Sequence, residues 1–591
     1  MHRKWQFIAS VSCCVVLIGA SRAAAREIHV AKSGNDTNSG GAEYPYLTIS
    51  KAAAVARPGD TITVHAGTYR EWVRPARGGD GTDARITYRA AAHEEVVIKG
   101  SERVTTWSAE GNGLWKVELP NASFGDYNPY ALTLSGGWLL YGQWHHRGDV
   151  YLDGKALSER RTRAEVARDQ RTWCCQADDH VTTIWANFGS ARPNRRLTEI
   201  NARPSVFFPE KSGLQYVTVD GFQIMHSAEN WEPPGLPLQM GAIGPRMGKH
   251  WIIQNCTVTH ARCVGIILGH ARGVDYADID AFGDHVVRNN VIRHCGEAGI
   301  AGQEGAARCL IENNLIEDTN DRREFGGWET AAIKLHQSVD VIIQHNLIRR
   351  VSHQTHGAFG IWLDWANQGA RVTGNIIYDT QTEALFLEMD HGPTLVDNNI
   401  LVGGGVKSNS EASVFAHNLL VDCPFRMVSD TRRRSQYHKP HSKIVVERKQ
   451  GIPRDDKWFY NIFVRQGLDR VRQATGYVSD YNLFLEGARP SRFEGTHSRV
   501  APFAARFERT DRPGGVSLQF AVNQPALEIT GPWVDGQLVG VFPTVGQTIE
   551  DRDGRPMRVD VGMLDRQRQS PRVGPLADPR AGRNTISRTT P

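Results

Sequence analysis

Residues 360–400 read GIWLDWANQGARVTGNIIYDTQTEALFLEMDHGPTLVDNNI and contain one unit of sequence twice. Each copy starts with a short apolar run that ends in an acidic residue, Asp364 or Glu388. Each then reaches an asparagine 11 residues later, Asn375 or Asn399, so the copies are 24 residues apart. A repeat of this length indicates a solenoid, in which every unit stacks on its neighbours.

The asparagine phrase recurs along the chain as VRNNVI, IENNLI, IQHNLI, VTGNII, VDNNIL and FAHNLL, with weaker copies YNIF and YNLF. The first six copies are spaced 24, 32, 29, 24 and 19 residues apart. This spacing predicts a right-handed parallel β-helix, whose coils of short strands stack roughly 4.8 Å apart. Asparagine suits a turn column because it tolerates the left-handed conformation and can hydrogen-bond along a stack. The asparagines in register are Asn290, Asn314, Asn346, Asn375, Asn399, Asn418, Asn461 and Asn482.

Interruptions of the repeat divide the chain into segments. Residues 26–100 read as an amino-terminal cap with the first coils, including a helix at 49–56 that is expected to cover the open end of the stack. Residues 101–205 carry alternating strands such as GLWKVELPN and TTIWANFG, and predict an inserted β-sandwich. Residues 206–490 form the main β-helix, and 491–591 are expected to be a β extension with a mobile or draped Arg- and Pro-rich tail.

The composition agrees with an all-β globular protein. Among 591 residues, 40% are apolar, 23% are charged, and Gly and Pro number 58 and 27, which favours turns and strands over long helices. These values exclude wholesale disorder and a polytopic membrane protein. The net charge is only +5 and no module carries a basic stripe, so nucleic-acid binding is not expected.

Residues 1–25 predict an export signal. Arg3 and Lys4 precede an apolar stretch over 5–20, and three alanines at 23–25 provide a cleavage site of small residues. The mature chain is then expected to begin at Arg26, in the periplasm or outside the cell. The apolar stretch is short for a membrane anchor, and no later segment is long and apolar enough, so no membrane association is expected.

The cysteines that remain after this signal are not expected to bind zinc, because they form no CxxC pair and no Cys/His ligand spacing. Their number is odd, so at least one thiol stays unpaired, and they are expected to act as small buried apolar residues. The seven are Cys174, Cys175, Cys256, Cys263, Cys295, Cys309 and Cys423.

A second phrase aligns five strands that precede the turns, GIILG, GIAGQ, AIKLH, GIWLD and ALFLE, which end at Gly269, Gln303, His336, Asp364 and Glu388. If they are one strand in successive coils, their last residues form a column. Asp364 and Glu388 then lie one coil apart, and their carboxylates are expected at about 5 Å.

Two carboxylates at this separation have a specific chemistry. Retaining glycosidases place the nucleophile and the acid/base about 5–5.5 Å apart, whereas inverting enzymes need about 6.5–9.5 Å to admit a water. Like charges this close do not both ionise easily, so one pKa is expected to rise into the range of a general acid. The spacing therefore favours the retaining mechanism.

The residues beside the pair suit a sugar-binding cleft. His336 lies one coil before Asp364 and could orient a carboxylate or bind a sugar hydroxyl. Trp362 and Trp365 flank Asp364, and parity places Trp362 on the same face. An aromatic ring beside a carboxylate pair can stack on a pyranose.

Further candidates lie near the ends of this region. Glu329 precedes the His336 strand in a unit long enough to carry a loop, and His391 follows Glu388. Both are candidate substrate-binding residues. The Trp-His-His run at 144–146 could reach the cleft from the insertion, which is expected to wall one end of it.

Other interpretations stay open at this stage. Asp364, Glu388 and Asp390 could ligate Ca²⁺, which would suit a polysaccharide lyase with Lys334 or Arg371 as its base. A non-catalytic carbohydrate-binding protein or adhesin is also compatible, although adhesins usually have near-identical coils and these coils differ in length. Nucleophile-elbow, P-loop and dinucleotide motifs are absent from any suitable context.

The segments GIWLDWANQGARVTGNIIYD and ALFLEMDHGPTLVDNNILV resemble the catalytic core of the β-xylosidases of glycoside hydrolase family 120. The resemblance extends to IHVAKSGND, to PYLTISKAAAVARPGDTITVHAGTYRE, and to GDVYLDGKAL within the insertion, and so covers most of the mature chain. It implies a right-handed β-helix interrupted by an immunoglobulin-like sandwich. By this resemblance, Asp364 would be the nucleophile, Glu388 the acid/base, and His336 a subsite residue.

The sequence thus predicts an exported, exo-acting retaining glycosidase that releases xylose from β-xylo-oligosaccharides. No cofactor is required, no catalytic metal is expected, and bound calcium would be structural. Another specificity on the same scaffold, arabinosidase or fucosidase, and the calcium-dependent lyase are the alternatives. A homo-oligomer is compatible with the sequence but not indicated by it.

Overall fold

The computed structural model describes residues 25–231, 237–271, 274–472 and 475–589. The predicted export signal at 1–25 falls outside the described residues except for Ala25, so export stays a prediction. Within the described ranges, no helix is long and apolar enough to cross a membrane.

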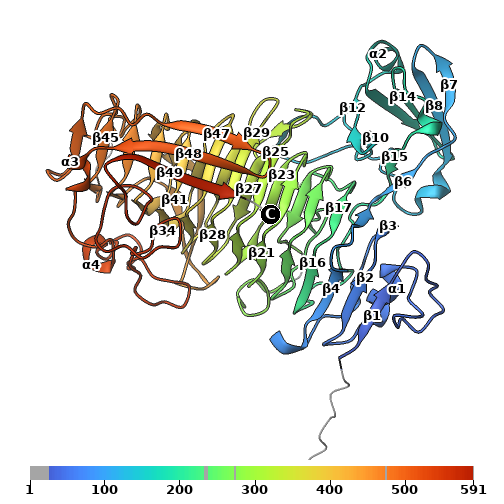
Figure 1. Cartoon of the computed structure of the whole chain (residues 1–591), viewed down its shortest axis with the longest axis horizontal. Coiled ribbons are helices and arrows are strands. Elements are labelled where there is room, and N and C mark those ends of the chain that lie inside the picture. Colours follow the sequence, from blue (N-terminus) through green and yellow to red (C-terminus); the bar gives the residue numbers. More distant parts are fainter. Residues whose placement is uncertain (1–24, 232–236, 272–273, 473–474, 590–591) are drawn as a thin grey trace, which may run out of the picture.

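The body of the protein is a parallel β-helix with three long sheets (Figure 1). Two sheets have 13 strands each, one running from β1 (Glu27–Val30) to β44 (Val478–Asp480) and the other from β3 (Gly67–Arg70) to β46 (Arg499–Ala501). The third sheet has seven strands and is the one that the five aligned phrases predict. Its strands are β20 (Val264–Ile267), β23 (Ala298–Gly302), β27 (Ala331–His336), β30 (Phe359–Asp364), β33 (Leu385–Glu388), β36 (Val406–Ser408) and β39 (Phe425–Met427).

The core of the stack consists of columns of aliphatic side chains, one from each coil. In the first sheet, parallel pairing places Ile253, Val287, Ile311, Ile343 and Val372 directly above one another, and each is at most 1% exposed. Branched residues fit this arrangement because they pack well between pleated strands. The period read from the sequence is therefore the period of the core.

The predicted asparagine column is present as a buried hydrogen-bonded ladder. The Nδ2 of Asn290 donates to Oδ1 of Asn314 at 3.0 Å, and the same bond continues coil by coil to Asn482. The expected left-handed conformation is wrong for these asparagines. It belongs to the residue before each one, such as Asn289 (φ 56°) and Asn313 (φ 53°). The ladder asparagines instead satisfy the backbone of the turn from inside.

The insertion leaves the stack unbroken. Strand β4 (Ile86–Ala90) pairs directly with β16 (Val217–Asp220), and β5 (Val96–Lys99) pairs with β17 (Gln223–Met225). Between them, two sheets pack around a separate apolar core that includes Trp107, as expected for a β-sandwich. One sheet contains β6 (Ser101–Arg103), β10 (Val150–Leu152), β11 (Lys155–Ala156) and β15 (Thr198–Asn201). The other contains β7 (Ser108–Gly111), β8 (Leu114–Pro120), β12 (Ser158–Glu159), β13 (Thr172–Ala177) and β14 (Val181–Asn187). The predicted fold class is confirmed.

A buried ion network fastens the insertion to the stack. Arg262, fully buried, pairs with Glu324 at 2.8 Å and with Glu159 of the insertion at 3.1 Å. Arg322 pairs with Asp149 of the insertion at 2.7 Å. Such pairs specify one docking position, because breaking any of them leaves a buried charge without compensation.

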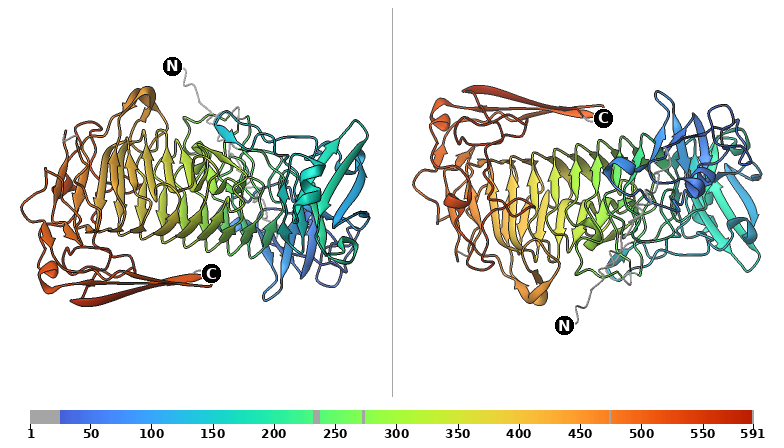
Figure 2. Two further views of the ribbon diagram at one scale, coloured as in Figure 1. Left: turned by 90° about the horizontal axis from the view of Figure 1, so that it is seen from above. Right: turned by 90° about the horizontal axis from the view of Figure 1, so that it is seen from below.

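The first and last elements of the described chain pack against the body of the protein. The helix α1 (Ile49–Val55) buries Ile49, Ala52 and Ala53 at the amino-terminal end, as predicted. Strands β47 (Glu508–Arg512), β48 (Gly515–Val522) and β49 (Gly582–Thr589) form an antiparallel sheet along the outside of the stack (Figure 2). The tail is thus draped over the body, and Arg568, 2% exposed, donates to Asn398 Oδ1 at 2.6 Å. Six of the seven cysteines in the described ranges are buried, and none of these seven is part of a disulfide.

Candidate active site

The column predicted from the aligned strands is present on the outer face of the seven-stranded sheet. His336 in β27 is the register partner of Asp364 in β30, and Asp364 is the partner of Glu388 in β33. Inward residues of these strands, such as Leu363, belong to the core, so alternation turns the three polar side chains outward. Asp364 is nevertheless only 6% exposed.

Asp364 and Glu388 are register partners in adjacent parallel strands, so each carboxyl group lies close enough to shift the pKa of the other. Burial, and then the charge of Asp364, raise the pKa of Glu388 to about 8. Burial also acts to raise the pKa of Asp364, but the positive charges of His336 and Lys334 outweigh it and hold that pKa below its usual range. At neutral pH the pair therefore holds one proton, on Glu388.

Lys334 supplies the positive charge beside Asp364. Its Nζ, on a side chain 2% exposed, lies 2.7 Å from Asp364 Oδ2 and 3.3 Å from Glu329 Oε2. It also donates to the backbone oxygen of Trp328 at 2.6 Å. The sequence suggested Lys334 only as a lyase base, whereas the structure makes it, with His336, one of the groups that keep Asp364 ionised.

Glu329 and His336 complete the group around Asp364. His336 Nε2 lies 3.2 Å from Glu329 Oε2 and 3.2 Å from Asp364 Oδ2, so one nitrogen faces both carboxylates. Glu329 lies in the segment before β27, as the loop-length argument predicted, and is 4% exposed. The structure therefore brings Glu329, His336, Asp364 and Glu388 together.

Trp362 has a different place from the one expected. It is on the same face as Asp364, but it is 1% exposed and packs against Phe359 and Phe386, at centroid distances of 4.3 and 5.3 Å. Lys334 Nζ lies 3.0 Å from the centre of its ring, so neither face is open to a sugar. Its Nε1 instead donates to Glu388 Oε2 at 3.0 Å, which positions the carboxyl that carries the proton.

Trp365 forms part of a wall beside the column. Its Nε1 donates at 3.2 Å to Gln436 in the hairpin of β40 (Asp430–His438) and β41 (Val445–Gly451). From the same hairpin, the Arg433 guanidinium lies 5.9 Å from the Trp365 ring and 4.7 Å from the ring of Trp138. Trp138 comes from the insertion, which is therefore part of this wall, as expected.

The insertion does not reach the column through the Trp-His-His run, as the sequence suggested. His145 is 2% exposed and pairs with Glu159 at 2.9 Å, within the docking network. The contact is made by β9 (Leu139–Tyr141), which pairs with β26 (Gly326–Gly327) just before Glu329. Trp138 had no sequence signal, because it lies almost two hundred residues from Glu329 and outside any repeat.

His391 is not placed to bind substrate. It is 1% exposed, its Nδ1 lies 3.1 Å from Glu411 Oε1, and its Nε2 lies 2.7 Å from Ser435 Oγ. His391 begins β34 (His391–Asp397), a strand of the first sheet, and so leaves the catalytic face after Glu388. One ring nitrogen thus contacts the hairpin through Ser435, and the other contacts Glu411 of β37 (Glu411–Ala416).

The calcium arrangement suggested by the sequence is not formed. Asp390 is fully buried, and its Oδ1 accepts from the backbone N–H and the side-chain amide of Asn367 at 2.9 and 3.0 Å. Burial raises the pKa of Asp390 well above its usual range. It anchors the turns that follow Asp364 and Glu388 rather than facing the column.

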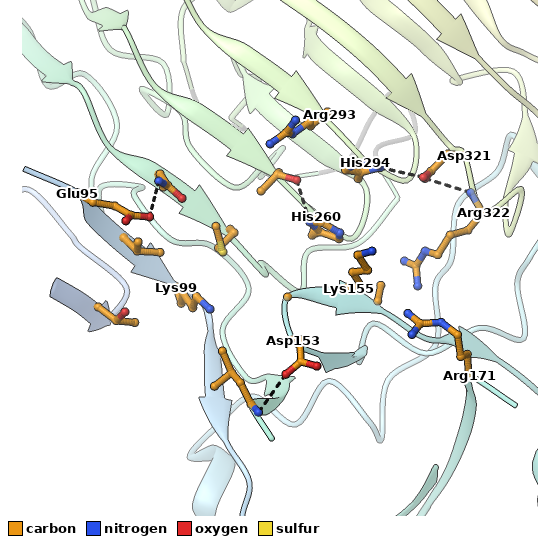
Figure 3. Close-up of a pocket in the computed structure, with 18 residues that line it drawn as sticks. Glu95, Lys99, Asp153, Lys155, Arg171, His260, Arg293, His294, Asp321 and Arg322 are labelled. Carbon is orange, nitrogen blue, oxygen red and sulfur yellow. Dashed lines mark hydrogen bonds and ion pairs between the residues drawn. The ribbon is translucent and has the colours of Figure 1, made fainter. Parts of the chain in front are cut away.

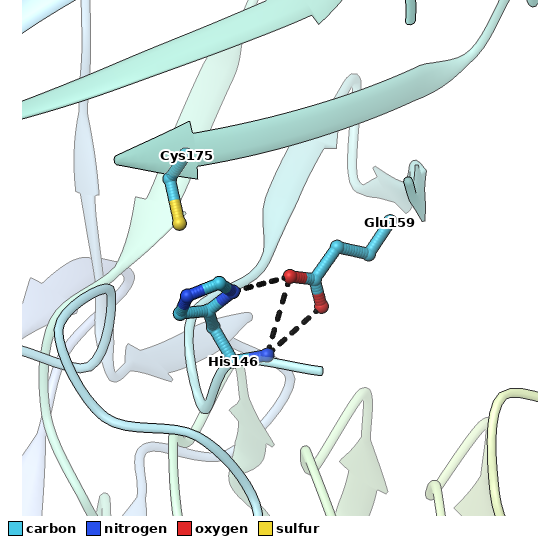
Figure 4. Close-up of side chains that lie close together, drawn as sticks. All are labelled: His146, Glu159 and Cys175. Carbon is cyan, nitrogen blue, oxygen red and sulfur yellow. Dashed lines mark hydrogen bonds and ion pairs between the residues drawn. The ribbon is translucent and has the colours of Figure 1, made fainter. Parts of the chain in front are cut away.

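Two groups of described residues have donor atoms close enough for a metal ion, and each already has an organic cation beside one of its carboxylates. Glu329, His336 and Asp364 surround the Lys334 ammonium. Figure 4 shows the second group, His146, Glu159 and Cys175. There Glu159 is bound by His146 at 2.5 Å and by Arg262, and burial raises the pKa of the Cys175 thiol well above its usual range. Neither group favours an added metal ion.

A cavity of about 480 Å³ is lined by Trp328, the residue before Glu329, but not by His336, Asp364 or Glu388. Trp328 is 37% exposed and stacks on His356 at a centroid distance of 4.8 Å. Lys407 lines the same cavity and lies over the ring of Phe386 at 4.1 Å.

The fold and this pair of carboxyl groups define a glycoside hydrolase on a β-helix, and comparison with known proteins identifies the family. The model of the glycoside hydrolase 120 insertion domain matches residues 104–200, the right-handed β-helix region matches 242–421, and a family of unknown function, DUF1565, matches 32–74. A solved structure described as the complex of XylC with xylose is 33% identical, with a TM-score of 0.87 over 95% of this chain and 100% of that one. The chain belongs to glycoside hydrolase family 120.

Two further matches are more limited. The uncharacterized protein YwoF of Bacillus subtilis (strain 168) is 35% identical over 108 residues, which is 17% of this chain and 23% of that protein. A solved glycoside hydrolase is 14% identical with a TM-score of 0.40, covering 80% of this chain and 96% of that one.

Proposed function

We propose that this protein is an exo-acting retaining β-xylosidase that releases xylose from β-xylo-oligosaccharides. The observation that carries the proposal is the pairing of Asp364 and Glu388 in adjacent strands, with one pKa held low and the other raised to about 8. Xylose is the sugar named for XylC, the relative that spans the whole chain.

In the proposed reaction, Asp364 attacks the anomeric carbon while Glu388 gives its proton to the departing glycosidic oxygen. The bond from the sugar to the leaving group breaks as the ester with Asp364 forms. Glu388, now ionised, takes a proton from water, and the hydroxide oxygen displaces Asp364 from the sugar. Each carboxyl group returns to its starting state, so no cofactor is consumed.

Exo action is supported by the wall of Trp138, Arg433 and Trp365, because a site closed on one side accepts the end of a chain more readily than its middle. We also propose that the protein is exported, from the signal-like residues 1–25.

The test is hydrolysis of aryl glycosides, β-xyloside, α-arabinoside and α-fucoside included, with proton NMR to follow the first anomer released. We expect β-xyloside cleavage with retention, abolished in Asp364→Ala and partly restored by azide in Glu388→Ala. Preference for arabinoside or fucoside would change the specificity and keep the mechanism. Release of the inverted anomer would overturn the retaining mechanism, and unsaturated products from a uronate would overturn the hydrolase assignment.

A further inference from the structure

A second cavity, of about 730 Å³, lies between the inserted sandwich and the β-helix (Figure 3). The insertion contributes the β10–β11 turn and Arg171, and the body contributes outward residues of β5, β17, β19 (Thr257–Thr259) and β22 (Val291–Arg293). These body strands belong to the second 13-stranded sheet, whereas the catalytic column is on the seven-stranded sheet. The cavity is therefore on another face of the coil.

The carboxylates that line this cavity already have partners. Asp153 pairs with Arg196, and Asp321 lies 2.8 Å from His294 Nδ1. Glu95 accepts a hydrogen bond of 2.9 Å from the Gln223 amide. The carboxylates of the rim thus already make ion pairs or hydrogen bonds within the protein.

Several cations of the rim are not paired in this way. Lys155, Arg171 and Arg293 are exposed, and their side chains make no hydrogen bond or ion pair with another residue of the described structure. Figure 3 shows Lys155, Arg171 and Arg322 directed toward a common space. Arg322 is compensated by the buried Asp149, so the surplus positive charge comes from the other three. A cavity of one sign concentrates an oppositely charged ligand.

The cavity also offers surfaces that a small inorganic anion would not use. Val97, Met225 and Leu197 contribute apolar area, and the rings of His260 and His294 lie 4.9 Å apart on the body side. Sugar rings present apolar C–H faces to such surfaces and hydroxyls to polar groups around them. Arginine and lysine side chains bind a carboxylate on the same ligand through charge-assisted hydrogen bonds.

We propose that this cavity is a non-catalytic binding site for an oligosaccharide that carries a uronate group. The choice of a saccharide rests on the proposed function, while the choice of an acidic one rests on the cavity itself. Such a site would hold a branched or acidic polysaccharide against the protein while chain ends are cleaved on the other sheet.

The test is calorimetric titration of the full chain with xylotetraose carrying one glucuronate branch, with unbranched xylotetraose and with inorganic phosphate. Asp364→Ala is the background, so that no probe is hydrolysed. Lys155→Ala, Arg171→Ala and Arg293→Ala are combined on it. Arg470→Ala, Arg512→Ala and Arg552→Ala form the matched control, since they remove three exposed charges elsewhere.

We expect the branched acidic probe to bind about tenfold more weakly to the cavity variant than to the control, with unbranched xylotetraose unaffected. Hydrolysis of aryl β-xyloside, measured without the Asp364 substitution, should be equal in the cavity variant and wild type. Equal binding of the acidic probe to both variants would overturn the proposal. So would phosphate binding at this site with no binding of the acidic sugar. Lack of xyloside hydrolysis by wild type would refute the proposed function, while the titration would still test this site.

Discussion

Lys334 Nζ lies 2.7 Å from Asp364 Oδ2, and both side chains are nearly inaccessible to solvent. Together with His336, an ammonium so placed keeps the carboxylate ionised. One of the charges that the proposed nucleophile needs is thus provided by Lys334, two positions before His336 on the neighbouring strand.

Substitution of Lys334 by methionine is expected to lower kcat/KM by about 100-fold or more, since a buried carboxylate loses its partner in a low-dielectric site. The pKa of Asp364 should rise, so the acid limb of the pH profile should move to higher pH. Lys249→Met is the control: it removes a similarly buried ammonium, one that lies 3.5 Å from Asp284 outside the column. Equal losses of kcat/KM in both variants would show that Lys334 contributes only to stability.

The pH dependence of kcat/KM should have a wide plateau. Glu388 acts while protonated, so activity should fall as the pH rises through about 8. Asp364 acts while ionised, so activity should fall only when the pH drops below the usual carboxylic range. Glu388→Gln, assayed on a substrate with a good leaving group, should lose the alkaline limb. An alkaline limb that persists unchanged in this variant would assign that limb to another group.

Trp362→Phe tests the hydrogen bond to Glu388 by itself. The phenyl ring keeps most of the packing with Phe359 and Phe386 but removes the Nε1–H that donates at 3.0 Å. Because that donor favours the ionised carboxylate, its loss should raise the pKa of Glu388 and move the alkaline limb upward. Phe386→Leu, which alters the same cluster without touching the hydrogen bond, should leave the limb in place.

The asparagine ladder should contribute strongly to stability. In Asn375→Ala, the Asn346 N–H and side-chain amide lose their acceptor, and the Ile343 carbonyl loses its donor. With all these groups buried, we expect a loss of about 2–4 kcal/mol in denaturant unfolding. Asn289→Gly changes the left-handed residue before the ladder and should stay within about 0.5 kcal/mol of wild type. Equal losses in the free energy of unfolding for the two variants would contradict a stabilising role of the ladder.

Arg262→Met should weaken the docking of the insertion. Three buried carboxylates, those of Asp149, Glu159 and Glu324, share this guanidinium, and its removal is expected to cost about 3–5 kcal/mol. Thermal unfolding followed by calorimetry should show a separate, earlier transition for the insertion. Arg163→Met, which removes an exposed ion pair with Glu110, should give the same thermal unfolding profile as wild type.

The stack of coils could be predicted from the sequence because the same repeat unit recurs in every coil. The ladder residues and the column of His336, Asp364 and Glu388 follow from a fixed period, so counting residues places them. The left-handed residue of each turn was misplaced by one position, because an asparagine next to a turn can serve either by its backbone or by its side chain. Only the geometry of Asn290 and its successors distinguishes the two.

The surroundings of the column could not be predicted in the same way. Parity placed Trp362 on the correct face, but it did not show that Phe359 of the same strand and Phe386, its register partner in β33, cover the ring. His391 follows Glu388 in sequence and yet belongs to another sheet, because the chain turns at that point. Trp138 reaches the site through tertiary contact alone, for which a single sequence holds no signal.

The insertion has a consequence for how the chain is made. Strand β5 pairs with β17, so its outer edge has no partner until more than a hundred further residues have been synthesised. At about 5–20 residues per second, the nascent first coils wait for several seconds with their backbone amides and carbonyls open to other strands. The sandwich, complete by β15, can fold during this interval. The folded sandwich would then hold the two ends of the inserted segment closer together before β5 pairs with β17.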